Sequence, residues 1–154
     1  MGWARILIAE DEPDCREIYR LILEPRYDLV MASNGAEAWY LIQSSDPDLL
    51  ILDLGMPGFD GLTLIEKIKG EPKLAQIPII VITGSTVGAE LPDSFFGKVS
   101  GVDDFITKPF ESSQIYAAIE KTFHAHFEWL RERKRKVPKE IEEEESNCDY
   151  GAGI

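Results

Sequence analysis

The sequence predicts an α/β fold in which a parallel five-stranded sheet lies between two layers of helices. Short apolar runs of strand length alternate along the chain with segments of helical spacing, and this alternation occurs five times. Several runs are apolar at consecutive positions, as in central strands that are buried on both faces. Repeated strand-then-helix units build a parallel sheet covered by helices on both faces, which is a three-layer sandwich.

Composition limits the class of protein. The chain has 154 residues, of which 44% are hydrophobic, so it has room for one domain with a core of its own. No apolar run approaches the ~18 residues that suggest a membrane span, and acidic residues follow the N-terminus too early for a signal peptide. Cys15 and Cys148 fall in a predicted helix and a polar tail. We therefore expect a cytoplasmic protein without a disulfide framework or a membrane partner.

The net charge of −12 bears on the partners that the chain can bind. Phosphate contacts need clustered Lys and Arg, so direct DNA binding by the chain as a whole is not expected. Acidity by itself does not identify any other partner.

The elements follow one another in a regular order. The predicted strands cover residues 4–9, 27–32, 48–54, 77–83 and 103–107. The first segment between strands, residues 13–25, begins with Pro13, which suits the first turn of a helix. Its helical spacing places Ile18, Leu21 and Ile22 on one apolar face.

Two more segments read as helices in the same way. They are residues 33–45 and 60–70, with Ser33 and Asp60 as the expected N-caps. Residues 84–100 are the weakest helix, because glycine and proline interrupt the pattern.

The last helix has the strongest pattern and predicts an extended C-terminal helix that begins near Ser112. Its apolar residues are Ile115, Ile119, Phe123, Phe127 and Leu130, with Trp129 adjacent. Beyond about Phe123 this stripe has no obvious cover within the domain. A cover from a second copy, from another protein or from the chain's own folded-back tail, and a frayed amphipathic surface helix, remain equally open. We assign residues 126–145 to this helix extension and a charged linker, and residues 146–154 to a disordered tail.

Polar side chains stand where the predicted strands end. They are Glu10 and Asp11 after the first strand, Asp53 in the third, Thr83 in the fourth and Lys108 after the fifth. In open parallel sheets, ligands bind outside the carboxyl ends of the strands, where the strand order reverses. In a flavodoxin-like order of 2-1-3-4-5 the first and third strands are neighbours, so Glu10, Asp11 and Asp53 converge. Three carboxylates in one pocket raise one another's pKa unless a cation neutralises them, and an all-oxygen set suits Mg²⁺ or Mn²⁺.

Separated motifs in a fixed order resemble the receiver domain of two-component response regulators. They are AEDEP after the first strand, LDLGMPGFDG after the third, VITG at the fourth and DDFITKPF at the fifth. The resemblance covers about residues 4–125, and we assign residues 1–125 to a receiver domain. It implies a (βα)5 flavodoxin-like fold and a phosphoprotein that works in phosphorelay signal transduction. It implies no enzyme beyond a domain that assists its own phosphorylation and dephosphorylation.

The resemblance also implies a role for each acidic residue. Asp53 matches the phospho-acceptor, which attacks a phosphohistidine on a sensor histidine kinase or a phosphotransfer protein. Glu10 and Asp11 match the acidic pair that holds Mg²⁺ together with Asp53 and the backbone carbonyl of Gly55. Because a carboxylate is a weak nucleophile, most of the catalysis must come from positioning and charge neutralisation.

Further residues match the phosphoryl site and the switch of the family. Lys108 pairs with the phosphoryl oxygens, and the Gly84 amide contacts them. The Thr83 hydroxyl bonds the phosphoryl group once it is in place, and Phe105 turns inward when Thr83 moves. The family pattern also implies a cis peptide bond before Pro109.

The chain departs from the family pattern at several positions. Glu10 stands where aspartate is commoner, and Gly55 and Gly84 offer no side chain over the phosphoryl site. We therefore expect backbone geometry to set the dephosphorylation rate. The spacing from Thr83 to Lys108 is longer than usual, so the fourth helix is expected to be short or displaced.

Other readings of the same residues remain open. Glu10 and Asp11 alone fit an ordinary helix start, and Thr83 alone fits any strand. A haloacid-dehalogenase-like phosphatase needs a second acid where Gly55 stands, and a flavodoxin needs a hydroxyl- and glycine-rich loop where EDEPD stands. A fragment of a larger regulator or hybrid kinase and a degenerate, phosphorylation-independent receiver are the alternatives within the family. No effector domain is expected, so output passes through protein contacts, among them a homodimer through the C-terminal helix.

Overall fold

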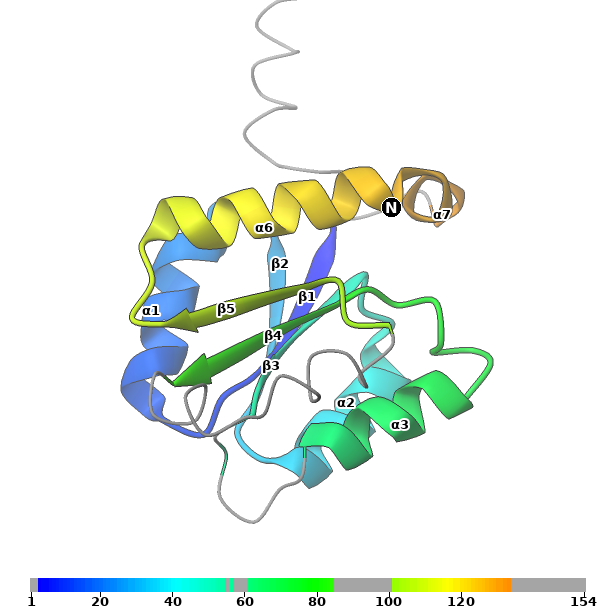
Figure 1. Cartoon of the computed structure of the whole chain (residues 1–154), viewed down its shortest axis with the longest axis horizontal. Coiled ribbons are helices and arrows are strands. Elements are labelled where there is room, and N and C mark those ends of the chain that lie inside the picture. Colours follow the sequence, from blue (N-terminus) through cyan, green and yellow to red (C-terminus); the bar gives the residue numbers. More distant parts are fainter. Residues whose placement is uncertain (1–2, 55, 57–60, 85–100, 134–154) are drawn as a thin grey trace, which may run out of the picture.

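The fold is a five-stranded parallel sheet between two layers of helices (Figure 1). The computed structural model describes residues 3–54, 56, 61–84 and 101–133. The strands are β1 (Arg5–Ala9), β2 (Asp28–Ala32), β3 (Leu49–Asp53), β4 (Ile79–Gly84) and β5 (Asp104–Lys108). The helices are α1 (Pro13–Leu23), α2 (Gly35–Ser45), α3 (Gly61–Gly70), α6 (Ser112–Ala125) and α7 (Phe127–Glu132). The strand order β2-β1-β3-β4-β5 confirms the predicted fold class.

Both faces of the sheet are buried because side chains of successive strand residues point to opposite faces. Leu50 and Leu52 of β3 face the core cluster under α2 and α3, whereas Leu49 and Ile51 face the cluster under α1 and α6. Figure 1 shows the same division, with α1 and α6 on one side of the sheet and α2 and α3 on the other. The continuous apolar runs in the sequence follow from this two-sided burial.

The packed face of α1 is not the predicted one. Ile18 and Leu21 are 49% and 71% exposed, whereas Tyr19 and Leu23 are 1% and 0% exposed. The stripe that contacts the core consists of Cys15, Tyr19, Ile22 and Leu23. This stripe also has helical spacing, and it buries the larger aromatic side chain, so tertiary packing selects it over the aliphatic face.

The N-cap of α2 is Asn34, so the prediction of Ser33 is wrong by one residue. Asn34 has an extended backbone, and its Oδ1 accepts a hydrogen bond from the Glu37 amide at 2.8 Å. The Ser33 amide and hydroxyl instead donate to the Glu37 carboxylate, each at 3.3 Å. Asp60, the other predicted N-cap, lies outside the described residues. Residues 85–100, which are all of the weakest predicted helix except Gly84, lie outside them too.

The C-terminal helix is not continuous. α6 ends at Ala125, and α7 turns sharply away from it after His126 (Figure 1). Leu130 is 3% exposed in the core cluster under α1 and α6, and Trp129 packs against both clusters. The domain itself therefore covers much of the stripe that the sequence left without cover, although Phe127 remains 55% exposed.

Side-chain contacts hold α7 under the amino ends of the strands. Arg133 Nε lies 2.6 Å from Asp48 Oδ1, and Arg133 Nη2 lies 2.8 Å from Asp46 Oδ1. Asp48 is fully buried, and its other oxygen accepts the Arg5 amide at 2.7 Å. These contacts are tertiary, which explains why helical spacing alone did not predict the break.

A second contact joins the α6–α7 turn to the strands. His126 Nε2 lies 2.6 Å from Asp103 Oδ1, and Asp103 Oδ2 accepts the Ile79 amide at 2.9 Å. The Asp103 amide in turn donates to the Ile79 carbonyl at 2.8 Å. Asp103 thus links the first residue of β4 to the C-terminal helices. Residues 134–154, with the predicted linker and tail, lie outside the described part of the chain.

Candidate functional site

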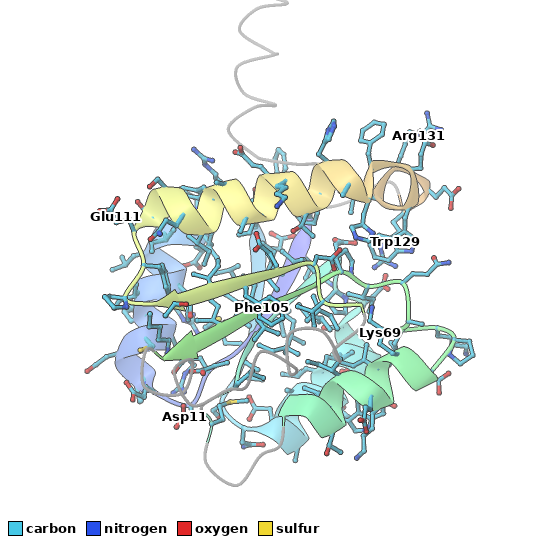
Figure 2. The ribbon with its side chains drawn as sticks, in the orientation of Figure 1. Asp11, Lys69, Phe105, Glu111, Trp129 and Arg131 are labelled. Atoms are coloured by element: carbon cyan, nitrogen blue, oxygen red, sulfur yellow. The ribbon has the colours of Figure 1, made fainter. Side chains whose placement is uncertain are left out.

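The predicted acidic residues meet at the carboxyl edge of the sheet. β1 and β3 are neighbours, and the register pairs Ala9 with Leu52, so the residues that follow lie side by side. Glu10, Asp11 and Asp53 each offer one carboxylate oxygen, and these oxygens all lie within 4.8 Å of one another. Figure 2 shows Asp11 at the end of the sheet toward which β4 and β5 point, opposite Trp129 and Arg131 at α7.

Lys108 connects two of the three acids. Its Nζ lies 2.9 Å from Glu10 Oε2 and 3.0 Å from Asp53 Oδ2. Glu10 is fully buried and Asp53 is 6% exposed. β5 places Lys108 there because the register pairs it with Gly84 at the end of β4. The peptide bond between Lys108 and Pro109 is cis, as expected.

Burial and neighbouring charges shift the pKa of Glu10 and of Lys108 at this site. Burial, followed by the hydrogen bond with Asp53, raises the pKa of Glu10 to about 7, although Lys108 opposes the shift. Burial lowers the pKa of Lys108, but the hydrogen bonds and charges of Glu10 and Asp53 outweigh burial and raise it overall. One ammonium therefore does not neutralise the cluster fully.

This donor set fits a hard divalent cation. The cluster is made of carboxylate oxygens at the ends of two adjacent strands, and among the described residues three carboxylates face one ammonium, that of Lys108. Mg²⁺ binds through one or two carboxylates and keeps several waters, so it does not need a closed cage of protein ligands. Asp11 is only half-buried, which leaves water access on its side of the cluster.

Other predicted site residues are only partly described. Thr83 lies in β4 and pairs in register with Thr107, but its side chain and all of Gly55 lie outside the described residues. Gly84 ends β4, and a Cβ added to it would meet nothing within 4 Å. Phe105 is partly buried against the core cluster under α2 and α3.

A pocket of about 430 Å³ adjoins the acidic cluster. It is lined by Cys15, Ile18, Tyr19, Gly84, Lys108, Pro109 and Phe110. The sequence did not reveal it, because the pocket depends on which face of α1 turns outward.

The sequence reasoning also missed Arg16 of α1. Its Nη1 donates hydrogen bonds of 2.9 Å to the carbonyl oxygens of both Glu10 and Asp11. The available signal was a basic residue one turn after an acidic loop.

No helix among the described residues is long and apolar enough to cross a membrane.

Comparison with known proteins identifies the family. Residues 6–120 match the family described as response regulator receiver domain. The response regulator GtcR of Aneurinibacillus migulanus is 35% identical over 133 residues, which are 86% of this chain and 52% of that protein. The sensor histidine kinase TmoS of Ectopseudomonas mendocina is 37% identical over 117 residues, 75% of this chain and 12% of the kinase.

A solved structure supports the same assignment. The receiver domain of AraT, a response regulator from Geobacillus stearothermophilus, has a TM-score of 0.69 and 31% identity, and the match covers 88% of this chain and 100% of that one. This chain spans about half or less of the curated relatives it matches, between 12% and 52% of their lengths. Together with the strand order and the acidic edge, these matches show that the chain belongs to the response regulator receiver domain family of two-component signal transduction.

Proposed function

We propose that Asp53 accepts a phosphoryl group from a phosphohistidine, in a reaction that needs Mg²⁺ or Mn²⁺. The observation that carries this proposal is the position of Lys108, whose Nζ lies within 3.0 Å of carboxylate oxygens of both Glu10 and Asp53. Asp53 is buried beside one ammonium and two further carboxylates. It can accept a phosphoryl group only if the negative charge of that group is neutralised.

Each residue of the cluster has a part in the transfer. Glu10, Asp11 and Asp53 would hold the metal with the Gly55 carbonyl, and the bound cation would neutralise phosphoryl oxygens. An Asp53 oxygen attacks phosphorus as the phosphorus–nitrogen bond breaks, which leaves an acyl phosphate on Asp53 and a histidine on the donor. Lys108 exchanges its contact with Asp53 for the new phosphoryl oxygens.

The switch would lie in the two strands beside Asp53. The Thr83 hydroxyl and the Gly84 amide would bond the phosphoryl group, and Phe105 would change its burial as Thr83 moves. The partial burial of Phe105 and the open space beside Gly84 are consistent with such a shift. Lys108 and Phe105 lie on the same strand, β5, so a movement of Lys108 at the phosphoryl site would move the strand that carries Phe105.

The donor would be a sensor histidine kinase or a phosphotransfer protein. Ile18 lines the pocket beside Lys108 and is 49% exposed, and Leu21 of the same helix is 71% exposed. Exposed aliphatic side chains on the helix that lines the pocket beside Lys108 suit the docking of a protein donor. The likeness to a sensor histidine kinase supports the same class of partner. Membership of the receiver domain family supports a cytoplasmic location.

Two alternatives rest on specific observations. The partial coverage of the relatives favours a receiver that belongs to a larger regulator or hybrid kinase. A homodimer through the C-terminal helix stays a prediction, and Phe127 is the large apolar side chain of α7 that is exposed to support it. A phosphorylation-independent binding module is disfavoured by the intact Lys108 contacts. A catalytic activity beyond self-phosphorylation is not proposed.

The test is phosphorylation by a small phosphodonor. Wild type and Asp53→Asn are incubated with acetyl phosphate, with Mg²⁺ or with excess EDTA, and the intact mass of each is measured. We expect a phosphoryl adduct only on wild type with Mg²⁺. An adduct of equal yield on Asp53→Asn, or no adduct on wild type, would contradict the proposal, and the second result would favour the phosphorylation-independent module.

A further inference from the structure

The loop that carries two of the acids is held by a side chain from the next helix. Arg16 is half-buried near the start of α1. Its Nη1 donates to the Glu10 carbonyl and to the Asp11 carbonyl, both at 2.9 Å. One guanidinium nitrogen therefore fixes two successive peptide groups, and the two side chains that leave this stretch of backbone are carboxylates of the acidic cluster.

Few other contacts fix this loop. The Glu10 amide donates to the Ala32 carbonyl at 2.9 Å, and the Glu12 amide donates to Glu10 Oε1 at 3.3 Å. Glu12 is the N-cap of α1, but its side chain makes no capping hydrogen bond. Within the described part of the chain, the Asp11 carboxylate has no hydrogen bond of its own, so its direction depends on the backbone that Arg16 holds.

We infer that Arg16 is a positioning residue for the metal ligands, because it fixes the backbone from which Glu10 and Asp11 project. The inference rests on the metal site of the proposed function. Contacts of this kind behind metal ligands are typically worth a factor of about 10–100 in metal affinity. The guanidinium orders the loop before the cation arrives, so binding does not have to order it.

The sign of the effect separates this role from simple electrostatics. Arg16 carries a positive charge near the site of a divalent cation, so its charge alone opposes metal binding. Removal of the charge would then tighten Mg²⁺ binding. If the two carbonyl contacts position the ligands, removal of the side chain weakens binding instead.

The experiment is a calorimetric titration of the whole chain with Mg²⁺. For Arg16→Met we expect affinity about 10-fold weaker than that of wild type. Arg16→Lys keeps a donor of similar reach and should restore most of the affinity. Arg20→Met is the matched control, because Arg20 lies one turn further along α1 and is exposed, and it should leave affinity unchanged. Thermal melts in EDTA show whether each variant is folded.

Each outcome decides between the two ideas. Affinity in Arg16→Met that equals or exceeds that of wild type overturns the positioning role but leaves the metal site intact. Wild type that binds Mg²⁺ no better than Asp53→Asn overturns the metal site, and the role of Arg16 with it. If Arg16→Met does not fold, Arg16→Gln replaces it, since the shorter amide cannot reach both carbonyls and carries the same expectation.

Discussion

Arg133 at the end of α7 should contribute more to stability than any other charged residue of that helix. Replacement of Arg133 by methionine keeps most of the aliphatic stem but removes the partner of Asp48, a carboxylate with no solvent exposure. The Arg133 guanidinium also stacks on the Trp129 ring, with its carbon 4.6 Å from the ring centroid. The variant therefore removes the Arg133 side of an ion pair whose carboxylate is buried, while the Arg5 amide still donates to that carboxylate.

The expected loss is large for a single surface-adjacent residue. Removal of one partner of a buried ion pair costs about 3–5 kcal/mol. The Arg133 side chain is 20% exposed and the Arg5 amide remains, so we expect the lower end, about 3 kcal/mol. For a domain of this size that loss lowers the Tm by about 10 °C.

The assay is thermal and urea unfolding of matched variants. Arg131→Met is the control, because Arg131 pairs with Glu128 on the same helix but both side chains are largely exposed, at 66% and 72%. That control should lose no more than about 0.5 kcal/mol. The double variant Asp48→Asn with Arg133→Met should recover part of the loss, since the buried charge is gone. Equal losses in Arg131→Met and Arg133→Met, or a double variant no more stable than Arg133→Met, would refute the reasoning.

Three further predictions concern the site and the core. Glu10 has a pKa of about 7, so it holds a proton at lower pH and must release it to bind a metal. Mg²⁺ affinity measured by calorimetry should therefore be about 10-fold weaker at about pH 6 than at about pH 8, and a Glu10→Gln variant with the same pH dependence would argue against it. Tyr19→Ala should cost about 3–5 kcal/mol in urea unfolding, whereas Leu21→Ala should change stability by less than about 0.5 kcal/mol; similar losses would mean that the exposed face of α1 is wrongly identified. Gly55→Lys should change the lifetime of phosphorylated Asp53, followed by loss of the phosphoryl adduct, and an unchanged lifetime would refute a role for the missing side chain.

The sequence predicted the sheet and its acidic edge well, for physical reasons. Strands buried on both faces must be continuously apolar, and parallel strands bring their carboxyl ends to one edge. The position of a polar residue at the end of such a run, such as Asp53, therefore follows from the order of the strands alone. Lys108 follows from the same rule, because its strand lies in the same sheet.

The errors arose where two local patterns were equally good. On α1 the aliphatic face that includes Ile18 and the buried face that includes Tyr19 are offset by one residue in the sequence. Both faces have helical spacing, so spacing alone does not choose between them. At the C-terminus no proline or glycine marks the break between α6 and α7. The break lies at His126, whose side chain contacts Asp103, a residue 23 positions earlier in the sequence. A contact so distant in the sequence cannot be recognised from the local helical pattern. Arg16 was missed for the same reason, since its contacts are with carbonyl oxygens that no side-chain pattern encodes.

The Asp103 contacts have a mechanical consequence for β4 and β5. Asp103 joins the start of β4 at Ile79 and the turn at His126, so both β4 and β5 are fixed at their amino ends. A strand that is fixed at its amino end moves most at its carboxyl end, and the carboxyl end of β5 is Lys108. We therefore expect β5 to bend over its length when the charge at Asp53 changes, while α7 keeps its position. The movement of β5 relative to α7 then changes the shape of the surface.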